Sequence, residues 1–473
     1  MHCGYIIEVK ELKPHLNADR LQILTCFGND TCVGLDVKIG DKGIYFPTDL
    51  QLSVEYCAEN HLCRKKADGS PDTGYMDPDK RNVTAVRLRG ERSDGLYMPL
   101  SSLEFTGVNM DDLNVGDTID IVNGVEICCK YIPRYIPRGN KCRGVGQSEG
   151  NRTRKKKVPI APLFAEHADT EQLAYNLNAF KPGDEIEITL KMHGTSQRTG
   201  YLPVFKGVKR TFWDKLFRRP GKPIYDWGYV TGTRRTVLDN FDGGFYGSNE
   251  FREPHAKFFE GKLHKGEEVF YEVVGFTTSG APIMGSVSNK KLNDKEFERQ
   301  YGPTTIFSYG CEPTGQREKF YRDEISIFSI PEPAPQSDFY VYRMTMTNED
   351  GDVVEYSPDF MRYRCKQIGV KCVPVFTKGY ITDNYVISTT YENGAKEYYH
   401  ESLGEAIKAL AEQYYDGPDP IGKTHVREGV VVRIVNRPSF TAYKHKNFAF
   451  KCLSGIITEE ATDVADADIA SEM

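Results

Sequence analysis

Residues 131–158 interrupt the chain with a sequence that is poorly suited to a packed core. From Lys130 to Lys157 there are ten Lys or Arg residues and a single acid, Glu149, together with several glycines and prolines. Glycine and proline disfavour helices and strands, and a run of like charges repels itself. We therefore expect a solvated basic linker over residues 131–158 that separates two domains.

The rest of the composition is typical of a globular protein. The 473 residues carry 61 Lys+Arg against 67 Asp+Glu, and 39% are apolar, which excludes a single small module and leaves material for two cores. No apolar run approaches the roughly 18 residues that cross a bilayer, and the first residues lack the pattern of a secretory signal. The sequence thus predicts a cytoplasmic protein with no membrane partner, and we expect a monomer.

Twelve cysteines are scattered along the chain. Cys57 with Cys63 and Cys365 with Cys372 do not have zinc-finger spacing. Reduced structural thiols are therefore expected rather than a metal cluster or a disulfide framework.

Before the linker, short β-branched and aromatic runs alternate with turn signals, which predicts a small all-β barrel or sandwich over residues 1–130. Two segments narrow this prediction, KPHLNADRLQIL at residues 13–24 and RLRGERSDGLYMPL at residues 87–100. Together they resemble the paired signatures of the OB-fold tRNA-binding module, although their polar residues could also do no more than form turns. Candidate contacts to a nucleic-acid strand, with surface solvation as the alternative, are Arg87, Arg89 and Arg92.

After the linker, the sequence predicts an α+β domain over residues 159–457. A short helix is expected near its start, with Asp169 or Thr170 as N-cap and apolar residues at Leu173, Leu177 and Phe180. β-rich segments follow, which indicates much antiparallel sheet: EIEITLKM, EVFYEVVGF, DFYVYRMTM, EGVVVRIV and AYKHKNFAFKCL. Residues 458–473 form an acidic tail that we expect to be disordered.

The segment from Lys191 to Ser196, KMHGTS, follows the predicted strand EIEITL. A lysine at the mouth of a sheet, followed by a glycine that lets backbone approach a ligand, suits an amine that attacks a phosphate. The tetrapeptide is weak by itself, because an exposed lysine before a turn has the same pattern.

Five further segments follow it along the chain, and each supplies a chemical group suited to a nucleotide site. They are VTGTRRT with a guanidinium fork, VFYEVVG with a carboxylate, DFYVYRM with aromatic rings, EGVVVR with a second carboxylate, and YKHKNFAFK with two lysines that the strand period places on one face. The residues of interest in these segments are Arg234, Arg235, Glu272, Tyr342, Glu428, Lys444 and Lys446.

In this order, KxHGT, VFxE, DFYVY, EGxVxR and KxKN closely resemble the motifs of the covalent nucleotidyltransferase superfamily, and within it the ATP-dependent RNA ligases. The motifs lie between residues 191 and 446, and the resemblance extends over essentially the whole chain. An OB module ahead of the transferase is similar to one subgroup of these ligases. The implied fold class is α+β, with an N-terminal OB-fold β-barrel followed by an antiparallel-sheet-rich adenylyltransferase domain.

The resemblance implies a covalent mechanism. Lys191 would attack the α-phosphate of ATP and become a lysyl-adenylate, which requires a neutral amine. Lys444 and Lys446 would contact the phosphate and, with a bound Mg²⁺ or Mn²⁺, favour loss of the lysine proton. Glu428 would organise the metal, directly or through water.

The resemblance assigns the remaining site residues to the nucleotide. Glu272 would bind the ribose hydroxyls, and His193 and Gly194 would lie at its phosphate. Tyr342 would stack on adenine, with an ordinary core aromatic as the alternative. Arg235 would engage the nucleotide and the RNA end, with Arg234 taking that role if the register shifts by one.

A second basic stretch lies at residues 205–222, where seven Lys or Arg residues and one acid interleave with aromatic residues. Aromatics among cations suit base stacking and phosphate contact. A helical apolar stripe through Phe212, Leu216 and Phe217 explains the pattern equally well.

The function implied is that of an ATP-dependent RNA ligase, which joins RNA 3′-OH and 5′-phosphate ends through lysyl-AMP and adenylated RNA. A nicked duplex and an RNA/DNA hybrid both remain open as substrates. A capping enzyme or DNA ligase is the first alternative, but these carry an OB domain after the transferase and only 27 residues follow Lys446. A non-catalytic RNA-binding relative is the second alternative. Such a protein would have lost catalytic residues, but every motif position in this chain keeps its residue.

Overall fold

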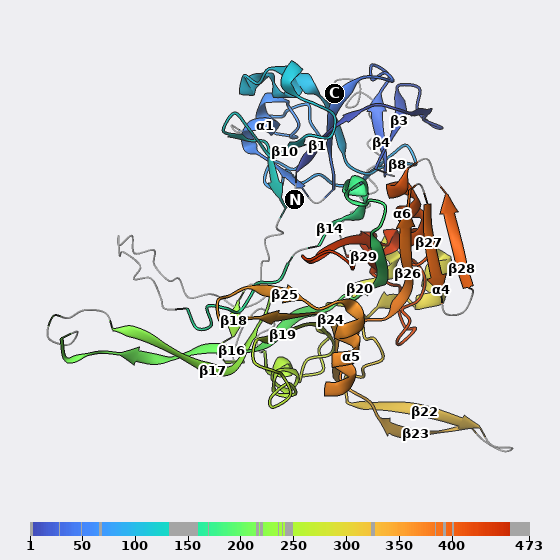
Figure 1. The fold of residues 1–473 in the computed structure, drawn as a ribbon. Helices are drawn as coiled ribbons and strands as arrows, with labels where there is room; N and C mark the ends of the chain where they lie inside the picture. The colour runs from blue at the N-terminus through green and yellow to red at the C-terminus, as the bar shows by residue number, and fades with distance from the viewer. Residues whose placement is uncertain are drawn as a thin grey trace. The chain divides into compact units, whose positions relative to one another are not determined.

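A computed structural model of the chain describes residues 3–454 except 28, 49, 66–68, 132–158, 169, 214–216, 218–220, 235, 239, 242–248, 323–326, 384, 391–393 and 400–401. The chain divides into two compact units, Met1–Gly150 with Lys451–Met473, and Asn151–Phe450 (Figure 1). The predicted acidic tail and the predicted linker beyond residue 131 lie outside the described residues.

The first unit is built from short antiparallel strands around one core. Its largest sheet has the order β10-β1-β5-β9, and a three-stranded sheet has the order β2-β3-β4. Ile44, Phe46 and Leu50 are fully buried at the centre of the core, with Tyr56 of the one α-helix in the described part of this unit. The elements are β1 (Gly4–Glu8), β2 (Leu12–Pro14), β3 (Leu21–Cys26), β4 (Asn29–Gly34), β5 (Lys42–Phe46), β6 (Leu50–Leu52), α1 (Val54–Glu59), β7 (Val86–Leu88), β8 (Glu91–Ser93), β9 (Leu96–Pro99), β10 (Thr118–Ile119), β11 (Ile121–Val122), β12 (Val125–Glu126) and β13 (Cys128–Lys130).

The two N-terminal motifs contact each other in this unit. The His15 ring lies 3.0 Å from the carbonyl oxygen of Leu88, and the side-chain amide of Asn17 donates to the carbonyl oxygen of Arg89 at 3.1 Å. Arg89 and the following glycine both have positive φ, which makes the β7–β8 turn tight. The polar residues of the first motif therefore hold the turn of the second.

The second unit contains two large sheets. One has the order β14-β30-β29-β15-β26-β27-β28 and the other has the order β18-β17-β16-β19-β24-β25; every pairing within them is antiparallel except that of β14 with β30. The elements are β14 (Glu171–Gln172), β15 (Glu185–Lys191), β16 (Thr195–Lys209), β17 (Lys222–Gly232), β18 (Val237–Leu238), α3 (Glu253–Lys257), β19 (Glu267–Gly275), β20 (Val287–Ser288), α4 (Lys295–Tyr301), β21 (Thr304–Thr305), β22 (Gln316–Arg322), β23 (Ile327–Pro333), β24 (Ser337–Thr347), β25 (Val353–Glu355), α5 (Pro358–Ile368), β26 (Val375–Thr382), β27 (Tyr385–Thr390), β28 (Gly394–Tyr399), α6 (Leu403–Glu412), β29 (Gly429–Ile434) and β30 (Thr441–Lys446), with α7 (Phe448–Leu453) across the boundary of the two units.

Each sheet has its own hydrophobic core. Helix α6 buries Ile407 and Leu410 against Ile188 and Val430 of the seven-stranded sheet. Helix α5 packs on the six-stranded sheet, where it contributes Met361 and Cys365 to a core around β19 and β24. The predicted α+β class with mostly antiparallel sheet is confirmed.

Two local predictions were wrong. The helix expected after the linker is instead the short strand β14 followed by two 3-10 turns, Leu173–Tyr175 and Leu177–Ala179, because residues 171–172 pair with β30. Leu173 and Phe180 are nevertheless buried, as their apolar pattern predicted. The segment AYKHKNFAFKCL is a strand only to Lys446, because the side chain of Asn447 accepts the Phe450 N–H at 3.2 Å and begins α7.

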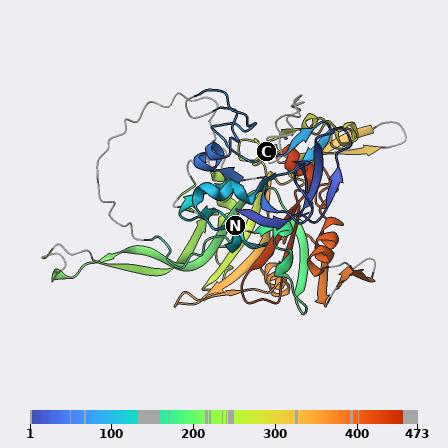
Figure 2. The ribbon, with the colours of Figure 1, turned by 90° about the horizontal axis from the view of Figure 1, so that it is seen from above.

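Two hairpins, β16–β17 and β22–β23, extend from the second unit, and the first extends from it in both ribbon views (Figures 1 and 2). In the part of the chain that the structure describes, no helix is long and apolar enough to cross a membrane. The described cysteines are free thiols, most of them buried.

Candidate active site

The two sheets of the second unit enclose a cavity of about 410 Å³. It is lined by Lys191 at the end of β15, Ser196 at the start of β16, Glu272 of β19, Tyr342 of β24 and Arg433 of β29. The predicted motifs, which are far apart in sequence, therefore meet at one place because their strands are neighbours in the two sheets.

A row of cross-strand neighbours places the charged residues beside the cavity. Gly429 of β29 pairs with Lys191 on one side and with Lys446 on the other. A Cβ atom on Gly429 would lie 2.1 Å from the carbonyl oxygen of His445, so only glycine permits this approach. The preceding residue, Glu428, is thereby placed between the two lysines.

Glu428 is the centre of the charges in the cavity. Its Oε1 lies 2.7 Å from Lys191 Nζ and 3.3 Å from Lys446 Nζ, and its Oε2 lies 3.6 Å from His193 Nδ1. Burial by itself would raise the pKa of this carboxyl, but the two ammonium groups and His193 outweigh burial and hold the pKa well below its usual range. Glu428 is therefore a permanent anion at neutral pH.

The pKa of the Glu272 carboxyl is shifted in the opposite direction. Burial raises the pKa of its carboxyl to about 7, the Lys191 ammonium opposes this rise, and the charge of Glu428 adds to it. Two carboxyls in one cavity thus differ in protonation near neutral pH, because only one of them lies between two ammonium groups.

The residues present suit one divalent cation that is shared with a phosphate. Oε2 of Glu428 is buried and accepts no hydrogen bond from the described residues, so it has a lone pair available. The described residues contain no group of three or more His, Cys, Asp or Glu that could hold a metal by themselves. Mg²⁺ keeps several waters and is often bound by one or two carboxylates plus substrate phosphates, which fits the ionised Glu428 carboxylate at this cavity.

The backbone after Lys191 is held by a residue that the motifs did not indicate. The N–H of His193 donates to the hydroxyl of Tyr309 at 2.7 Å. The His193 ring makes edge contacts with Phe307 and Phe450, with centroids 4.5 and 4.7 Å away. A Cβ on Gly194 would lie 2.5 Å from the carbonyl oxygen of Val273, so this glycine is needed for β16 to start against β19.

Tyr342 lies at an irregularity of β24. The register shifts so that Arg343 pairs with Phe270 and Val341 pairs with Tyr271, which leaves Tyr342 as the extra residue of a β-bulge. Bulges re-aim side chains near active sites. Its hydroxyl lies 3.1 Å from both Ser196 Oγ and His167 Nδ1, so the ring is held at the cavity wall.

Of the remaining predicted site residues, some can be placed relative to the cavity and one lies outside the described residues. Lys444 pairs with Val431, which lines the cavity, so the two side chains lie on one face of the sheet. Arg235 lies outside the described residues, whereas its alternative, Arg234, lines the cavity.

Sequence reasoning missed a group of buried supporting residues. Arg252 donates to the Ser196 carbonyl oxygen at 3.1 Å and to Thr195 Oγ1 at 2.5 Å. Arg198 donates to the carbonyl oxygens of Thr233 and Phe164 and pairs with Glu268 at 3.4 Å. The alternation of polar residues in β16 and β19 could have indicated inward charges, but no sequence signal identifies their partners.

Comparisons with known proteins address the fold. No protein-family model and no curated protein matches the sequence. Solved structures of Naegleria gruberi RNA ligase do match the structure: a mutant with ATP and Mn has TM-score 0.51 and 15% identity, covering 95% of this chain and 98% of that chain. The ligase with PPi has TM-score 0.50 and 14% identity over the same shares. The predicted resemblance is thus confirmed in three dimensions, and the chain has the fold of these RNA ligase structures over nearly its whole length.

Proposed function

We propose that the chain is an ATP-dependent RNA ligase that joins a 3′-OH end to a 5′-phosphate end. The observation that carries the proposal is the row of Lys191, Glu428 and Lys446 at a cavity that also holds Glu272 and Tyr342. The fold shared with ligase structures solved with ATP, Mn and PPi supports this chemistry.

In the first step, Lys191 Nζ attacks the α-phosphorus of ATP. A phosphoramidate bond forms, the bond from the α-phosphorus to the bridging oxygen of the β-phosphate breaks, pyrophosphate leaves, and the amine loses its proton. Lys446 contributes positive charge where negative charge develops on the phosphoryl oxygens, and Lys444 is assigned the same role.

Glu428 Oε1 lies 2.7 Å from Lys191 Nζ, so the two side chains form an ion pair. A cation that competes for the carboxylate would weaken this contact. Glu428 would hold Mg²⁺ or Mn²⁺ with phosphate oxygens as further ligands, and the metal would neutralise charge on the phosphates.

The remaining residues bind the nucleotide. Glu272 would accept hydrogen bonds from the ribose hydroxyls, and Tyr342 would stack on adenine. His193 and Gly194 would lie beside the phosphate, and Arg234 or Arg235 would engage the nucleotide and the RNA end.

In the second and third steps, a 5′-phosphate oxygen of RNA attacks the phosphorus of lysyl-AMP and displaces Lys191. The 3′-OH then attacks the activated 5′-phosphate and AMP leaves. Residues 1–130, proposed to be an OB domain, would hold the 3′-OH strand. Residues 159–457 would form the adenylyltransferase domain. A cytoplasmic, monomeric enzyme is part of the proposal.

The test is incubation of purified protein with α-labelled ATP or GTP and Mg²⁺ or Mn²⁺, followed by denaturing electrophoresis. We expect label on the protein from ATP, discharged by 5′-phosphate RNA. Lys191→Ala should abolish the label, and Lys257→Ala, which removes an exposed lysine of α3, should leave it unchanged.

The alternatives give different outcomes. Label from GTP alone would indicate a capping enzyme, and discharge only by nicked DNA would indicate a DNA ligase. Full labelling of Lys191→Ala would contradict the mechanism. No label from either nucleotide would favour a non-catalytic RNA-binding protein.

A further inference from the structure

The β16–β17 hairpin extends well beyond the sheet to which it belongs. Strand β16 pairs with β19 only from Thr195 to Gly200, but it pairs with β17 as far as Lys209. From residue 201 outward the hairpin is therefore a two-stranded ribbon of about 30 Å, given a rise of about 3.3 Å per residue. Figures 1 and 2 show it projecting from the second unit.

The base of this ribbon has a core of its own. Leu202 and Val204 are buried with Val230 against Phe164. The N–H of Phe205 donates to the carbonyl oxygen of Ile160 at 2.7 Å. Since a lone two-stranded ribbon is marginally stable, these contacts explain how the inner half stays folded.

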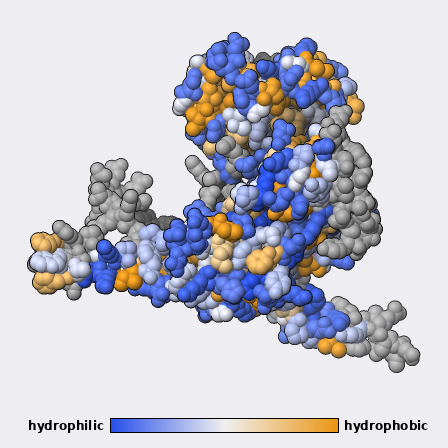
Figure 3. Space-filling model, viewed as in Figure 1, coloured by the Kyte–Doolittle hydropathy of each residue, from blue (hydrophilic) through white to orange (hydrophobic). Residues whose placement is uncertain are grey.

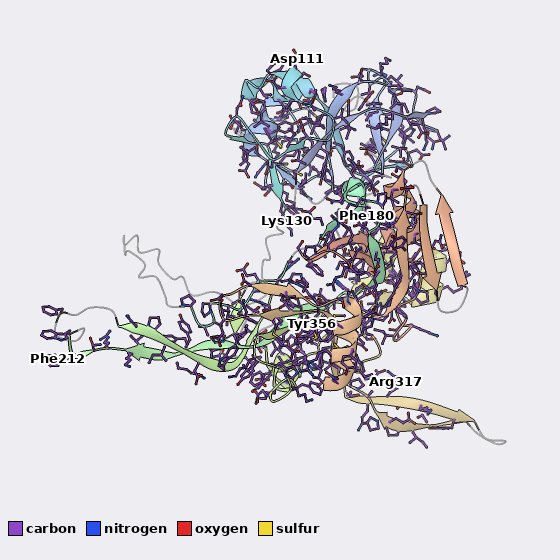
Figure 4. The ribbon with its side chains drawn as sticks, in the orientation of Figure 1. Asp111, Lys130, Phe180, Phe212, Arg317 and Tyr356 are labelled. Carbon is purple, nitrogen blue, oxygen red and sulfur yellow. The ribbon has the colours of Figure 1, made fainter. Side chains whose placement is uncertain are left out.

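The end of the ribbon is different, because large aromatic side chains there are exposed. Phe212 is 73% exposed, Trp213 is 61% exposed and Phe217 is 59% exposed. Figure 4 shows Phe212 at the far end of the hairpin, and Figure 3 shows apolar residues at that end. The alternative of a helical apolar stripe is met only in its backbone: Phe212 and Trp213 are helical and the N–H of Phe217 donates to the Trp213 carbonyl oxygen at 2.9 Å, but the Phe212 and Phe217 rings are exposed, and Leu216 lies outside the described residues.

The three exposed rings contact one another, two of them face to face. The Trp213 and Phe217 rings are stacked, with centroids 5.9 Å apart and an interplanar angle of 13°, and Phe212 meets Trp213 edge-on at 5.8 Å. Exposed aromatic clusters at the end of an extended element are typical of interaction sites, since they add nothing to the fold.

The charged residues around the aromatic cluster indicate what kind of molecule it binds. Described positions of the ribbon from residue 205 to 227 carry four basic residues and one acid, Asp226. The basic residues are all exposed: Lys206, Lys209, Arg210 and Lys222. Over its whole sequence the second hairpin differs, because residues 316–333 contain three basic and four acidic residues, whereas residues 205–227 contain seven basic and two acidic residues. Positive charge beside stacked rings fits a polyanion with flat bases rather than an apolar or acidic protein groove.

We propose that the end of the β16–β17 hairpin binds unpaired RNA: Trp213 and Phe212 stack on bases while Lys206, Lys209, Arg210 and Lys222 contact phosphates. This rests on the proposed ligase function and adds a substrate-binding site to it. Strand β16 starts at the cavity with Thr195, and its far end at Lys209 is about 45 Å away. At about 3.4 Å per stacked nucleotide, the RNA held there lies roughly a dozen nucleotides from the joined ends.

The two tryptophans of the chain make a direct test possible. In a Trp227→Phe protein, Trp213 is the sole tryptophan, and stacking of a base should quench its emission. We expect saturable quenching on titration with a 30-nucleotide single-stranded RNA, and weaker quenching with a duplex of the same length. Unchanged emission with RNA would overturn the proposal. So would emission that changes with protein concentration alone, which would indicate self-association.

Substitutions test the function of the site. Phe212→Ala/Trp213→Ala should weaken binding of the same RNA by at least about tenfold, because stacking contributes about 1–3 kcal/mol per base. Ile330→Ala, an exposed apolar residue of β23 at 47% exposure, is the matched control and should leave binding unchanged.

Ligation separates this proposal from the proposed function. The double variant should form lysyl-AMP like the wild type, and it should ligate RNA with short arms equally well but RNA with single-stranded arms longer than about a dozen nucleotides more slowly. Equal ligation of long-armed RNA by the variant and the wild type would overturn the hairpin site while leaving the ligase assignment intact. If the wild type formed no lysyl-AMP, the ligase assignment itself would be contradicted.

Discussion

Glu428 Oε1 lies 2.7 Å from Lys191 Nζ, and the same oxygen lies 3.3 Å from Lys446 Nζ. One carboxylate oxygen is thus shared by the proposed nucleophile and by a lysine assigned to the phosphate. This arrangement follows from the pairing of Gly429 with both lysines, so it is built into the sheet.

Replacing that carboxylate should stop the first step. In Glu428→Gln the amide keeps the shape but loses the charge that would hold the metal, and we expect lysyl-AMP formation to fall by roughly a hundredfold or more. Labelling with α-labelled ATP over a range of Mn²⁺ concentrations measures this. Asp419, a buried carboxyl beside the nearby His425, is a control for structural carboxylates, because Asp419→Asn should affect unfolding more than the metal dependence. A wild-type metal dependence in Glu428→Gln would contradict the assigned role.

The hydroxyl of Tyr309 should matter although it is outside the motifs. Tyr309→Phe keeps the ring contact with His425 at 4.5 Å but leaves the N–H of His193 without its acceptor. We expect the free energy of unfolding to fall by about 1–2 kcal/mol and lysyl-AMP formation to slow, because the backbone after Lys191 loses its position. Denaturant unfolding and single-turnover labelling measure the two effects. Unchanged values for both would show that this hydrogen bond has no function.

The buried pair of Arg198 and Glu268 should behave as a unit. The two side chains are 2% and 0% exposed, and burial raises the pKa of the Glu268 carboxyl to about 8, so Arg198→Met leaves a buried, largely protonated carboxyl without its partner and is expected to cost about 1–3 kcal/mol of unfolding free energy. The double variant Arg198→Met/Glu268→Leu should be less destabilised than Arg198→Met alone. A double-mutant cycle by denaturant unfolding measures the coupling, and strictly additive losses would contradict it.

Glu272 should make stability depend on pH. Burial raises the pKa of its carboxyl to about 7 from a usual value of 4.5, so ionising it in the folded state costs free energy. This cost is absent below the unfolded pKa, grows as pH rises from there, and is complete above about pH 7. Glu272→Gln should therefore gain stability relative to the wild type between about pH 5 and pH 8, by up to about 2 kcal/mol. Chemical unfolding at the two pH values measures this, and a relative gain at the lower pH would contradict the prediction.

The strands that carry the motifs could be predicted because their signal is local. Alternation and β-branched residues in EIEITL and VFYEVVG indicate strands, and β15 and β19 cover these segments. The helix expected near Leu173 failed for a tertiary reason, since pairing of residues 171–172 with β30 favours strand and turns there. The strand at Ala442 was predicted too long, because the cap at Asn447 is a single side-chain hydrogen bond.

The sequence by itself determined which chemical groups the candidate site contains and their order, because the proposed nucleophile, the carboxylate beside it and the second lysine each lie in a short motif. It also indicated that aromatic residues alternate with Lys and Arg residues near residue 212. Only the tertiary structure decided that Gly429 brings both lysines to one carboxylate oxygen, that Tyr309 and Arg252 hold the start of β16, and that Phe212 and Trp213 are exposed. These relationships join residues dozens to hundreds of positions apart, and their free energy comes from burial and pairing that exist only after the strands have assembled.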